Sequence, residues 1–243
     1  METYTAATYG ERCADVYDNW HGAYDEAAIK MLVELACGGP ALELGIGTGR
    51  IALPLMACGI KVHGIDTSPA MVARLRAKPG GDHIPVTVGS FADIGVEGKF
   101  SLIFVVFNTL FLLLSQEEQV RCFYSVARHL ATDGVFLIEA FVPDVTRYSG
   151  GQANKVTAVT TDQITLDMSR HDPVQQRVTG QKVVITDGGI RLYPIQIRYA
   201  WPSELDLMAQ LAGLRLRHRW GGWQREPFTS ESVKHVSIYE RAA

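Results

Sequence analysis

The 243-residue sequence lacks several features that mark specialised protein classes. Its four cysteines, Cys13, Cys37, Cys58 and Cys122, are widely spaced and form no C-x-x-C pair. Neither a structural zinc site nor a disulfide framework is therefore expected. The cysteines are interpreted as free and mostly buried thiols in a reducing compartment.

Signals for membranes and export are also missing. The strongest apolar run, Leu102–Leu114, is interrupted by Asn108 and Thr109. It falls short of the about 20 residues that a transmembrane helix needs. Residues 1–10 are polar and lack the basic-then-apolar pattern of a signal peptide. We therefore expect a cytoplasmic protein with no membrane partner.

Concentrated positive charge is absent as well. The chain has 23 Lys and Arg against 26 Asp and Glu, a net charge of −3, and no polybasic run. Nucleic-acid binders usually carry a dense basic surface that neutralises phosphates, so nucleic acid is not an expected partner. Hydrophobic residues make up 47% of the chain, which supports a full core.

Short apolar runs alternate with amphipathic ones from about Gly39 to Val142. This alternation predicts strand–helix–strand crossovers and a parallel sheet. Ser68-Pro69 predicts the start of a helix over Ala70–Lys78, Ser115 with Glu118 predicts a capped helix to about Leu130, and Thr132-Asp133-Gly134 predicts a turn. The expected strands are Ala41–Leu44, Lys61–Ile65, Val86–Val88, Phe100–Phe107 and Val135–Phe141.

After Pro143 the pattern changes to short strands separated by turn residues. Alternation places Ile164, Leu166 and Met168 on one face, and Asp187-Gly188-Gly189 predicts a hairpin. These segments predict an inserted antiparallel sheet, with strands at Val156–Val159, Gln163–Arg170, Arg177–Ile185 and Arg191–Arg198. The remaining expected elements are helices at Ala6–Trp20 and Asp25–Ala36, a helix capped by Ser203 and ending near Leu211, and strands at Arg215–Trp220 and Val233–Arg241.

A glycine-rich turn joins the first strand to the next helix. Gly45, Gly47 and Gly49 alternate, and Glu43 lies two residues before the first of them. A dinucleotide-binding turn needs glycine or alanine at the position of Arg50, so that ligand class is disfavoured. The E-x-G-x-G-x-G pattern instead resembles motif I of class I S-adenosylmethionine-dependent methyltransferases. That resemblance implies that Glu43 and the three glycines bind S-adenosyl-L-methionine.

The second strand ends in a sequence that strengthens this resemblance. Asp66, Ser68 and Met71 match the D-x-S-x-x-M pattern of the family. A carboxylate at this end of the strand can accept hydrogen bonds from both ribose hydroxyls, which assigns Asp66 to the ribose. Thr67 and Met71 are assigned to the same cofactor site, with Met71 near the adenine.

The third and fourth strands supply further cofactor candidates. The family often has an acidic residue where this chain has Ser90, so either Ser90 or Asp93 is expected to receive the adenine amino group. Phe91 is expected to contact adenine through its backbone and ring, and Phe107 is placed in the cofactor site at the end of strand four. Enzymes of this superfamily that methylate the amino groups of bases often carry an Asn/Asp-Pro-Pro-aromatic signature at the end of strand four. This chain has Phe107-Asn108-Thr109-Leu110 there and lacks the signature. The aspartates of metal-dependent relatives are absent too, so no metal is implied.

The resemblance extends to small-molecule N- and O-methyltransferases, including those acting on amino sugars and on glycine. It implies an α/β fold: a Rossmann-like, mostly parallel seven-stranded sheet with helices on both faces, plus the antiparallel insertion after strand five. Residues 1–38 would cover the active site, residues 39–144 and 200–243 would bind the cofactor, and residues 145–199 would form a substrate wall or lid.

The acceptor pocket is expected between Glu139–Asp144, the insertion and the N-terminal helices. Tyr17, with Tyr9 and Trp20, would line the cofactor entrance, and a plain packing role is the alternative for these rings. His171 and Glu139 are the candidate general bases. The predicted reaction is in-line transfer of a methyl group to a nitrogen or oxygen of a small molecule, and a homodimer is considered as the assembly. The alternatives are a noncatalytic S-adenosylmethionine-binding protein and a dinucleotide-dependent oxidoreductase.

Overall fold

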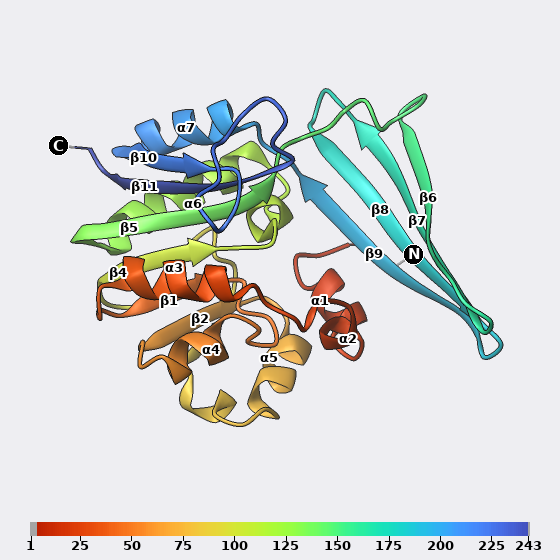
Figure 1. The fold of residues 1–243 in the computed structure, drawn as a ribbon, viewed down its shortest axis with the longest axis horizontal. Coiled ribbons are helices and arrows are strands. Elements are labelled where there is room, and N and C mark those ends of the chain that lie inside the picture. Colours follow the sequence, from red (N-terminus) through yellow and green to blue (C-terminus); the bar gives the residue numbers. More distant parts are fainter. Residues whose placement is uncertain (1–3, 243) are drawn as a thin grey trace.

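A seven-stranded sheet lies at the centre of the molecule in the computed structural model, which describes residues 4–242 (Figure 1). Its strands are β1 (Ala41–Leu44), β2 (Val62–Asp66), β3 (Val86–Val88), β4 (Phe100–Val105), β5 (Leu130–Phe141), β10 (Leu214–Trp220) and β11 (Lys234–Arg241). The order is β10-β11-β5-β4-β1-β2-β3. Strands β1 to β5 pair in parallel, whereas β11 is antiparallel to both of its neighbours. The expected sheet is confirmed.

Both faces of this sheet are covered by helices. In β4, Ile103 and Val105 pack with one buried cluster while Leu102 and Phe104 pack with another, as the twofold alternation of a strand requires. The helices are α3 (Glu26–Ala36), α4 (Ala52–Ala57), α5 (Pro69–Arg76), α6 (Gln116–His129) and α7 (Pro202–Leu211), with short 3₁₀ turns η1 (Gly81–His83) and η2 (Thr109–Leu112). The clusters place α6 and α7 on one face and α3 and α4 on the other.

A second, antiparallel sheet follows β5, as expected. It contains β6 (Gln152–Val159), β7 (Gln163–Asp172), β8 (Arg177–Thr186) and β9 (Gly189–Arg198), in that order. The predicted hairpin is present, because Thr186 pairs with Gly189 across a two-residue loop. Figure 1 shows this sheet standing beside the central one, with the N-terminal helices between the two.

The N-terminal segment differs from the expected single helix over Ala6–Trp20. It forms two short helices, α1 (Thr8–Cys13) and α2 (Tyr17–His21). Asp15 lies between the two helices. Its carboxylate accepts a hydrogen bond of 2.8 Å from Arg191 on β9. The α1 helix packs against β9, so the N-terminal segment is held to the antiparallel sheet on this side of the break.

Two smaller expectations were also wrong. Ser203 does not cap α7, because the helix already begins at Pro202, whose fixed φ suits the first helical position. The N-cap is Trp201, without a side-chain hydrogen bond. The predicted turn at residues 132–134 lies inside β5, at an irregularity where the pairing with β4 moves from Phe100↔Leu130 to Leu102↔Val135.

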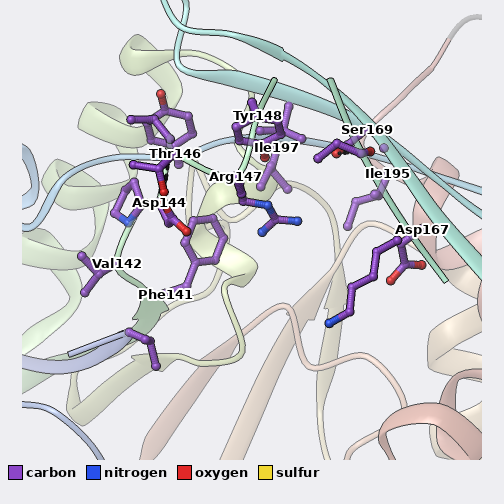
Figure 2. Close-up of a pocket in the computed structure, with 18 of the residues that line it drawn as sticks. Phe141, Val142, Asp144, Thr146, Arg147, Tyr148, Asp167, Ser169, Ile195 and Ile197 are labelled. Atoms are coloured by element: carbon purple, nitrogen blue, oxygen red, sulfur yellow. Dashed lines mark hydrogen bonds between the residues drawn. The ribbon is translucent and has the colours of Figure 1, made fainter. Parts of the chain in front are cut away.

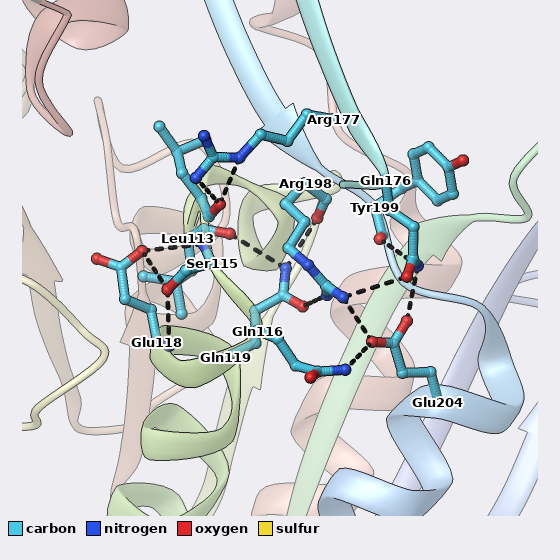
Figure 3. Close-up of polar contacts among 11 residues, drawn as sticks. Leu113, Ser115, Gln116, Glu118, Gln119, Gln176, Arg177, Arg198, Tyr199 and Glu204 are labelled. Atoms are coloured by element: carbon cyan, nitrogen blue, oxygen red, sulfur yellow. Dashed lines mark hydrogen bonds and ion pairs between the residues drawn. The ribbon is translucent and has the colours of Figure 1, made fainter. Parts of the chain in front are cut away.

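A buried polar network fixes the antiparallel sheet to the central domain (Figure 3). The side chain of Arg198, on β9, is 7% exposed and donates to Gln119 on α6 at 2.6 Å and to Glu204 on α7 at 2.7 Å. Arg177, on β8, donates through Nε to the backbone carbonyl of Leu114 at 2.9 Å. Side chains from β8, β9, α6 and α7 thus hold the two sheets in one arrangement.

Candidate functional site

The glycine turn after β1 contains three left-handed residues. Gly45, Gly47 and Gly49 have φ values of 76°, 55° and 79°, where L-residues with a side chain are strained. A Cβ atom would lie 2.3 Å from Thr109 at Gly45 and 2.3 Å from Leu75 at Gly49. At Gly47 it would meet no atom within 4 Å. The outer glycines therefore permit close packing, while Gly47 borders open space that a ligand can occupy.

Asp66, at the end of β2, faces this turn. Its Oδ2 accepts a hydrogen bond from the Gly47 amide at 2.7 Å, and its Oδ1 accepts one from the Ser68 amide at 2.9 Å. Burial raises the pKa of Asp66, although both amides oppose that shift. The carboxylate thus lies beside the open face of Gly47, as a receptor for ribose hydroxyls would.

Glu43 lies beneath the same turn and is 3% exposed. Burial raises its pKa well above the ordinary value, and the charge of Arg50 only partly opposes this. Its Oε2 atom is buried without a hydrogen-bond partner in the described chain. A buried carboxyl oxygen left without a donor is costly, so this atom fits a ligand that brings a donor to the turn.

Arg50 extends from the turn toward α2 and the end of β4. Its guanidinium carbon lies 4.9 Å from the ring centre of Phe107. Burial raises the pKa of Tyr17 to about 12, against the opposing charge of Arg50. The ring centre of His21 lies 5.1 Å from the ring centre of Tyr17 and 5.0 Å from the ring centre of Phe107. A cation and three rings therefore lie together beside the turn.

The backbone at the end of β4 is strained. Phe107 and Asn108 both have left-handed φ values, 57° and 67°, although neither is glycine. Glu139 holds this conformation by accepting a hydrogen bond from the Phe107 amide at 2.9 Å, and Asn108 accepts one from the Phe141 amide at 2.7 Å. Strain of this kind concentrates at functional sites, where surrounding contacts maintain it.

The residues expected near adenine lie in different environments. Ser90 accepts a hydrogen bond from the Ala92 amide at 3.2 Å, and Phe91 is buried in the core. Asp93 faces solvent and pairs with Arg121 on α6. Met71 is 4% exposed and packs in the cluster that includes Cys13 and Tyr193. Thr67 donates a hydrogen bond to the backbone carbonyl of Ala6 at 3.2 Å.

A cavity of about 800 Å³ opens where the acceptor pocket was expected (Figure 2). It lies between the end of β5, residues 142–148, the inner face of the antiparallel sheet, and the first two helices. Seven of its lining residues are aromatic: Tyr9, Trp20, Phe141, Tyr148, Tyr193, Tyr199 and Trp201. Its charged lining residues are Asp144, Asp167, Glu231, Arg147, Lys155 and Lys182.

Aromatic side chains connect this cavity to the glycine turn. Trp20 lines the cavity and its ring lies 4.6 Å from that of Tyr193 and 6.2 Å from that of His21. His21 in turn contacts Phe107, which lies beside Arg50. The cavity and the cofactor candidates therefore meet at α2 and the end of β4.

The two candidate bases are both engaged by neighbouring groups. Glu139 accepts hydrogen bonds from the Phe107 amide and, at 3.0 Å, from the indole of Trp223. His171 shares a hydrogen bond of 2.9 Å with the hydroxyl of Tyr199, and its ring stacks 4.4 Å from that of Tyr148. Their catalytic assignment stays a prediction from the sequence.

Contacts between α2 and the glycine turn were not foreseen from the sequence. The carboxylate of Asp18 accepts a hydrogen bond of 2.6 Å from Thr48 and pairs with Lys78 at 2.7 Å. Glu11, on α1, accepts a hydrogen bond of 2.7 Å from Ser68. These partners are 30 to 60 residues apart, and no local pattern marks them.

Comparison with known proteins identifies similar chains. The family model described as "Methyltransferase domain" matches residues 41–134. The CcbJ methyltransferase from Streptomyces caelestis is 39% identical, with a TM-score of 0.91 over 99% of this chain and 100% of that one. The cypemycin N-terminal methyltransferase from a Streptomyces species is 27% identical over 84% of each chain. The sugar N-methyltransferase KedS8 from Streptoalloteichus shares the fold at 18% identity, with a TM-score of 0.71 over 100% and 97% of the chains.

Proposed function

Because the chain belongs to the class I S-adenosylmethionine-dependent methyltransferases, we propose that it methylates an amino nitrogen of a small molecule bound in the cavity. The observation that carries this proposal is the aromatic lining of a cavity that adjoins the glycine turn at α2. Its rings favour a cationic amine over a neutral alcohol. Its three acidic residues are balanced by three basic ones, so the selection rests on the rings.

The residues of the turn fit the cofactor. The open face of Gly47 leaves room for its backbone, Asp66 suits the ribose hydroxyls, and the unpartnered oxygen of Glu43 suits the ammonium group. Arg50, whose charge acts on Glu43, is the nearby cation for the carboxylate of the cofactor's methionine part. S-adenosylmethionine supplies a methyl group that is already activated on a sulfonium, so the protein mainly has to align the acceptor and exclude water.

The names of two similar proteins also support nitrogen over oxygen. One is called an N-terminal methyltransferase and the other a sugar N-methyltransferase. An amine acceptor makes the smaller demand on the protein, because it needs only to be unprotonated, whereas a hydroxyl acceptor profits from a strong base during the transfer.

The test is a panel of paired acceptors assayed for S-adenosylhomocysteine formation. Methyl 3-amino-3-deoxyglucoside and L-alanyl-L-alanine amide are compared with the analogues that carry a hydroxyl in place of the amine. Turnover of amines alone supports the proposal, and turnover of the hydroxyl compounds would replace it by O-methylation. Tight S-adenosylmethionine binding without turnover of any acceptor in a broad amine library would favour the noncatalytic alternative.

Removing the carboxylate of Asp66 tests the ribose assignment. We expect Asp66→Ala to weaken S-adenosylmethionine binding by about 1–3 kcal/mol, because the ribose hydroxyls lose charge-assisted partners. Hydroxyl donors bind the ionised carboxylate of Asp66 in preference to its protonated form. Burial has raised the pKa of this carboxyl group. Wild-type affinity should therefore fall as the pH drops toward that pKa, and the variant should lose this dependence. Calorimetric titration at several pH values measures both effects, and unchanged affinity would remove Asp66 from the ribose site.

The outer face of the antiparallel sheet supports a homodimer. Two adjacent cross-strand rows are wholly apolar: Val159, Ile164, Ile185 and Ile190, then Val156, Leu166, Val183 and Leu192. Ile190 and Leu192 are 66% and 54% exposed, an unusual apolar surface for a monomer. Ile164 and Leu166 share this outer face, as their alternation predicts, and neither lines the cavity, whereas Met168 is one of the residues that line it.

We expect Leu192→Lys to convert such a dimer into monomers, because it places a charge within the apolar rows. The matched control is Val174→Lys, at a position that is 91% exposed in the β7–β8 turn and outside the rows. Light scattering after size exclusion measures both masses. A monomeric wild-type protein at tens of micromolar would contradict the dimer.

No helix in the described residues 4–242 is long and apolar enough to span a membrane. The cytoplasmic location stays a prediction from the sequence.

A further inference from the structure

His21 ends α2 at the junction between the cavity and the cofactor residues. It follows Trp20, which lines the cavity, and its ring lies 5.0 Å from that of Phe107 at the end of β4. The side chain is half-buried. Among the histidines of the chain, this one therefore lies beside both binding regions.

The ring nitrogens of His21 are free to bind a ligand. Within residues 4–242 the structure records ring contacts to this side chain but no hydrogen bond to either nitrogen. By contrast, His171 is bonded to Tyr199, and Glu139 accepts hydrogen bonds from an amide and an indole. Among the described residues, His21 is therefore a half-buried imidazole without a hydrogen-bond partner, and it can accept a proton.

The charges around His21 keep its imidazole neutral. Burial lowers its pKa below the ordinary 6.5, and the cations of Arg50, on the glycine turn, and Lys182, on β8, lower it further. The ring contacts of His21 on its own helix and on the β4 end are with Tyr17, Trp20 and Phe107. The acidic residue of α2, Asp18, is paired with Lys78. The side chain therefore carries a lone pair at neutral pH.

We propose that His21 accepts the proton that the acceptor amine loses before methyl transfer, an inference that rests on the proposed amine acceptor. The ammonium form gives one proton to an imidazole nitrogen, leaving a neutral amine and an imidazolium. The amine lone pair then forms the nitrogen–methyl bond while the methyl–sulfur bond breaks and its electron pair stays on sulfur. The imidazolium returns its proton to solvent after the products leave.

The test compares His21→Gln with wild type on the amine compounds of the panel, methyl 3-amino-3-deoxyglucoside and L-alanyl-L-alanine amide. We expect kcat/KM of the variant to fall by about 100-fold at neutral pH, the usual scale of general-base catalysis. The deficit should shrink as the pH approaches the pKa of the free amine, because solvent then supplies the unprotonated acceptor. The affinity for S-adenosylhomocysteine should stay within about twofold. The matched control is His218→Gln, at an exposed site on β10, with unchanged kinetics.

Several outcomes would overturn the assignment. An unaltered pH profile in an active His21→Gln variant leaves the proposed function intact but removes the base. A large loss of S-adenosylhomocysteine affinity makes His21 a cofactor ligand instead. If the wild-type protein methylates none of the amines, the proposed function itself is refuted, and with it the role of His21. A measurement that needs no acceptor is nuclear magnetic resonance titration of the His21 ring, where an imidazolium at neutral pH would equally refute the proposal.

Discussion

Replacing Gly47 by valine is expected to abolish detectable binding of S-adenosylmethionine, a loss of about 100-fold or more in affinity. The space beside Gly47 is open, with no atom within 4 Å of an added Cβ, and Asp66 and Glu43, the proposed cofactor ligands, border the same turn. A branched side chain would fill the volume that the cofactor needs. Calorimetric titration with S-adenosylmethionine and S-adenosylhomocysteine measures the loss directly.

The control for this variant is Gly38→Val. Gly38 has a φ of 75° and also has no atom within 4 Å of an added Cβ, but it lies in the turn before β1. Both variants carry the strain of a β-branched residue in the left-handed region, of the order of 1–2 kcal/mol. Equal destabilisation with selective loss of cofactor binding is expected. A folded Gly47→Val protein that binds as tightly as Gly38→Val would show that the cofactor does not approach Gly47.

The central sheet and the left-handed glycine turn were predictable because their signals are local. A strand buried on both faces, such as β4, has a nearly continuous apolar sequence. A left-handed turn that lies against a ligand needs glycine at fixed positions. Asp66 follows directly from its place at the end of a strand. The open space beside Gly47 and the carboxylate facing it support the proposed cofactor site, which stays a prediction.

Contacts between distant segments were not predictable. The pair of Asp15 with Arg191 joins residues that are 176 positions apart, and the role of Glu139 in holding Phe107 depends on two strand ends meeting. His21 carries no motif and gains its position only from packing against Phe107. Sequence periodicity describes which face of an element is apolar, but not which polar partners the fold will bring to it.

The second large effect concerns the junction of the two sheets, where we expect Arg198→Ala to lower the free energy of unfolding by about 3–5 kcal/mol. The guanidinium is almost fully buried and donates to both Gln119 and Glu204, whose side chain is only 16% exposed. Removing it leaves a buried carboxylate without its counter-charge. Urea unfolding followed by circular dichroism gives the free-energy difference.

The surface ion pair of Arg215 with Glu240 provides the matched control, since the Arg215 side chain is 61% exposed. Arg215→Ala should cost about 0–1 kcal/mol, because solvent screens an exposed pair. A loss at Arg198 no larger than at Arg215 would mean that the junction is held by apolar packing and that the buried pair adds nothing.

The same pair predicts how stability depends on pH. Burial would raise the pKa of Glu204, but hydrogen bonds from Arg198, Gln176 and Gln116 outweigh it and hold the pKa below the ordinary 4.5. A carboxyl group with a lowered pKa stabilises the fold fully above its unfolded value and loses that contribution as the pH falls through the folded value. Wild type should therefore lose stability in this acidic range more steeply than Glu204→Gln, measured as unfolding free energy against pH. Parallel curves for the two proteins would show that Glu204 does not bind Arg198 as a carboxylate, and the large cost predicted for Arg198→Ala would then lose its physical basis.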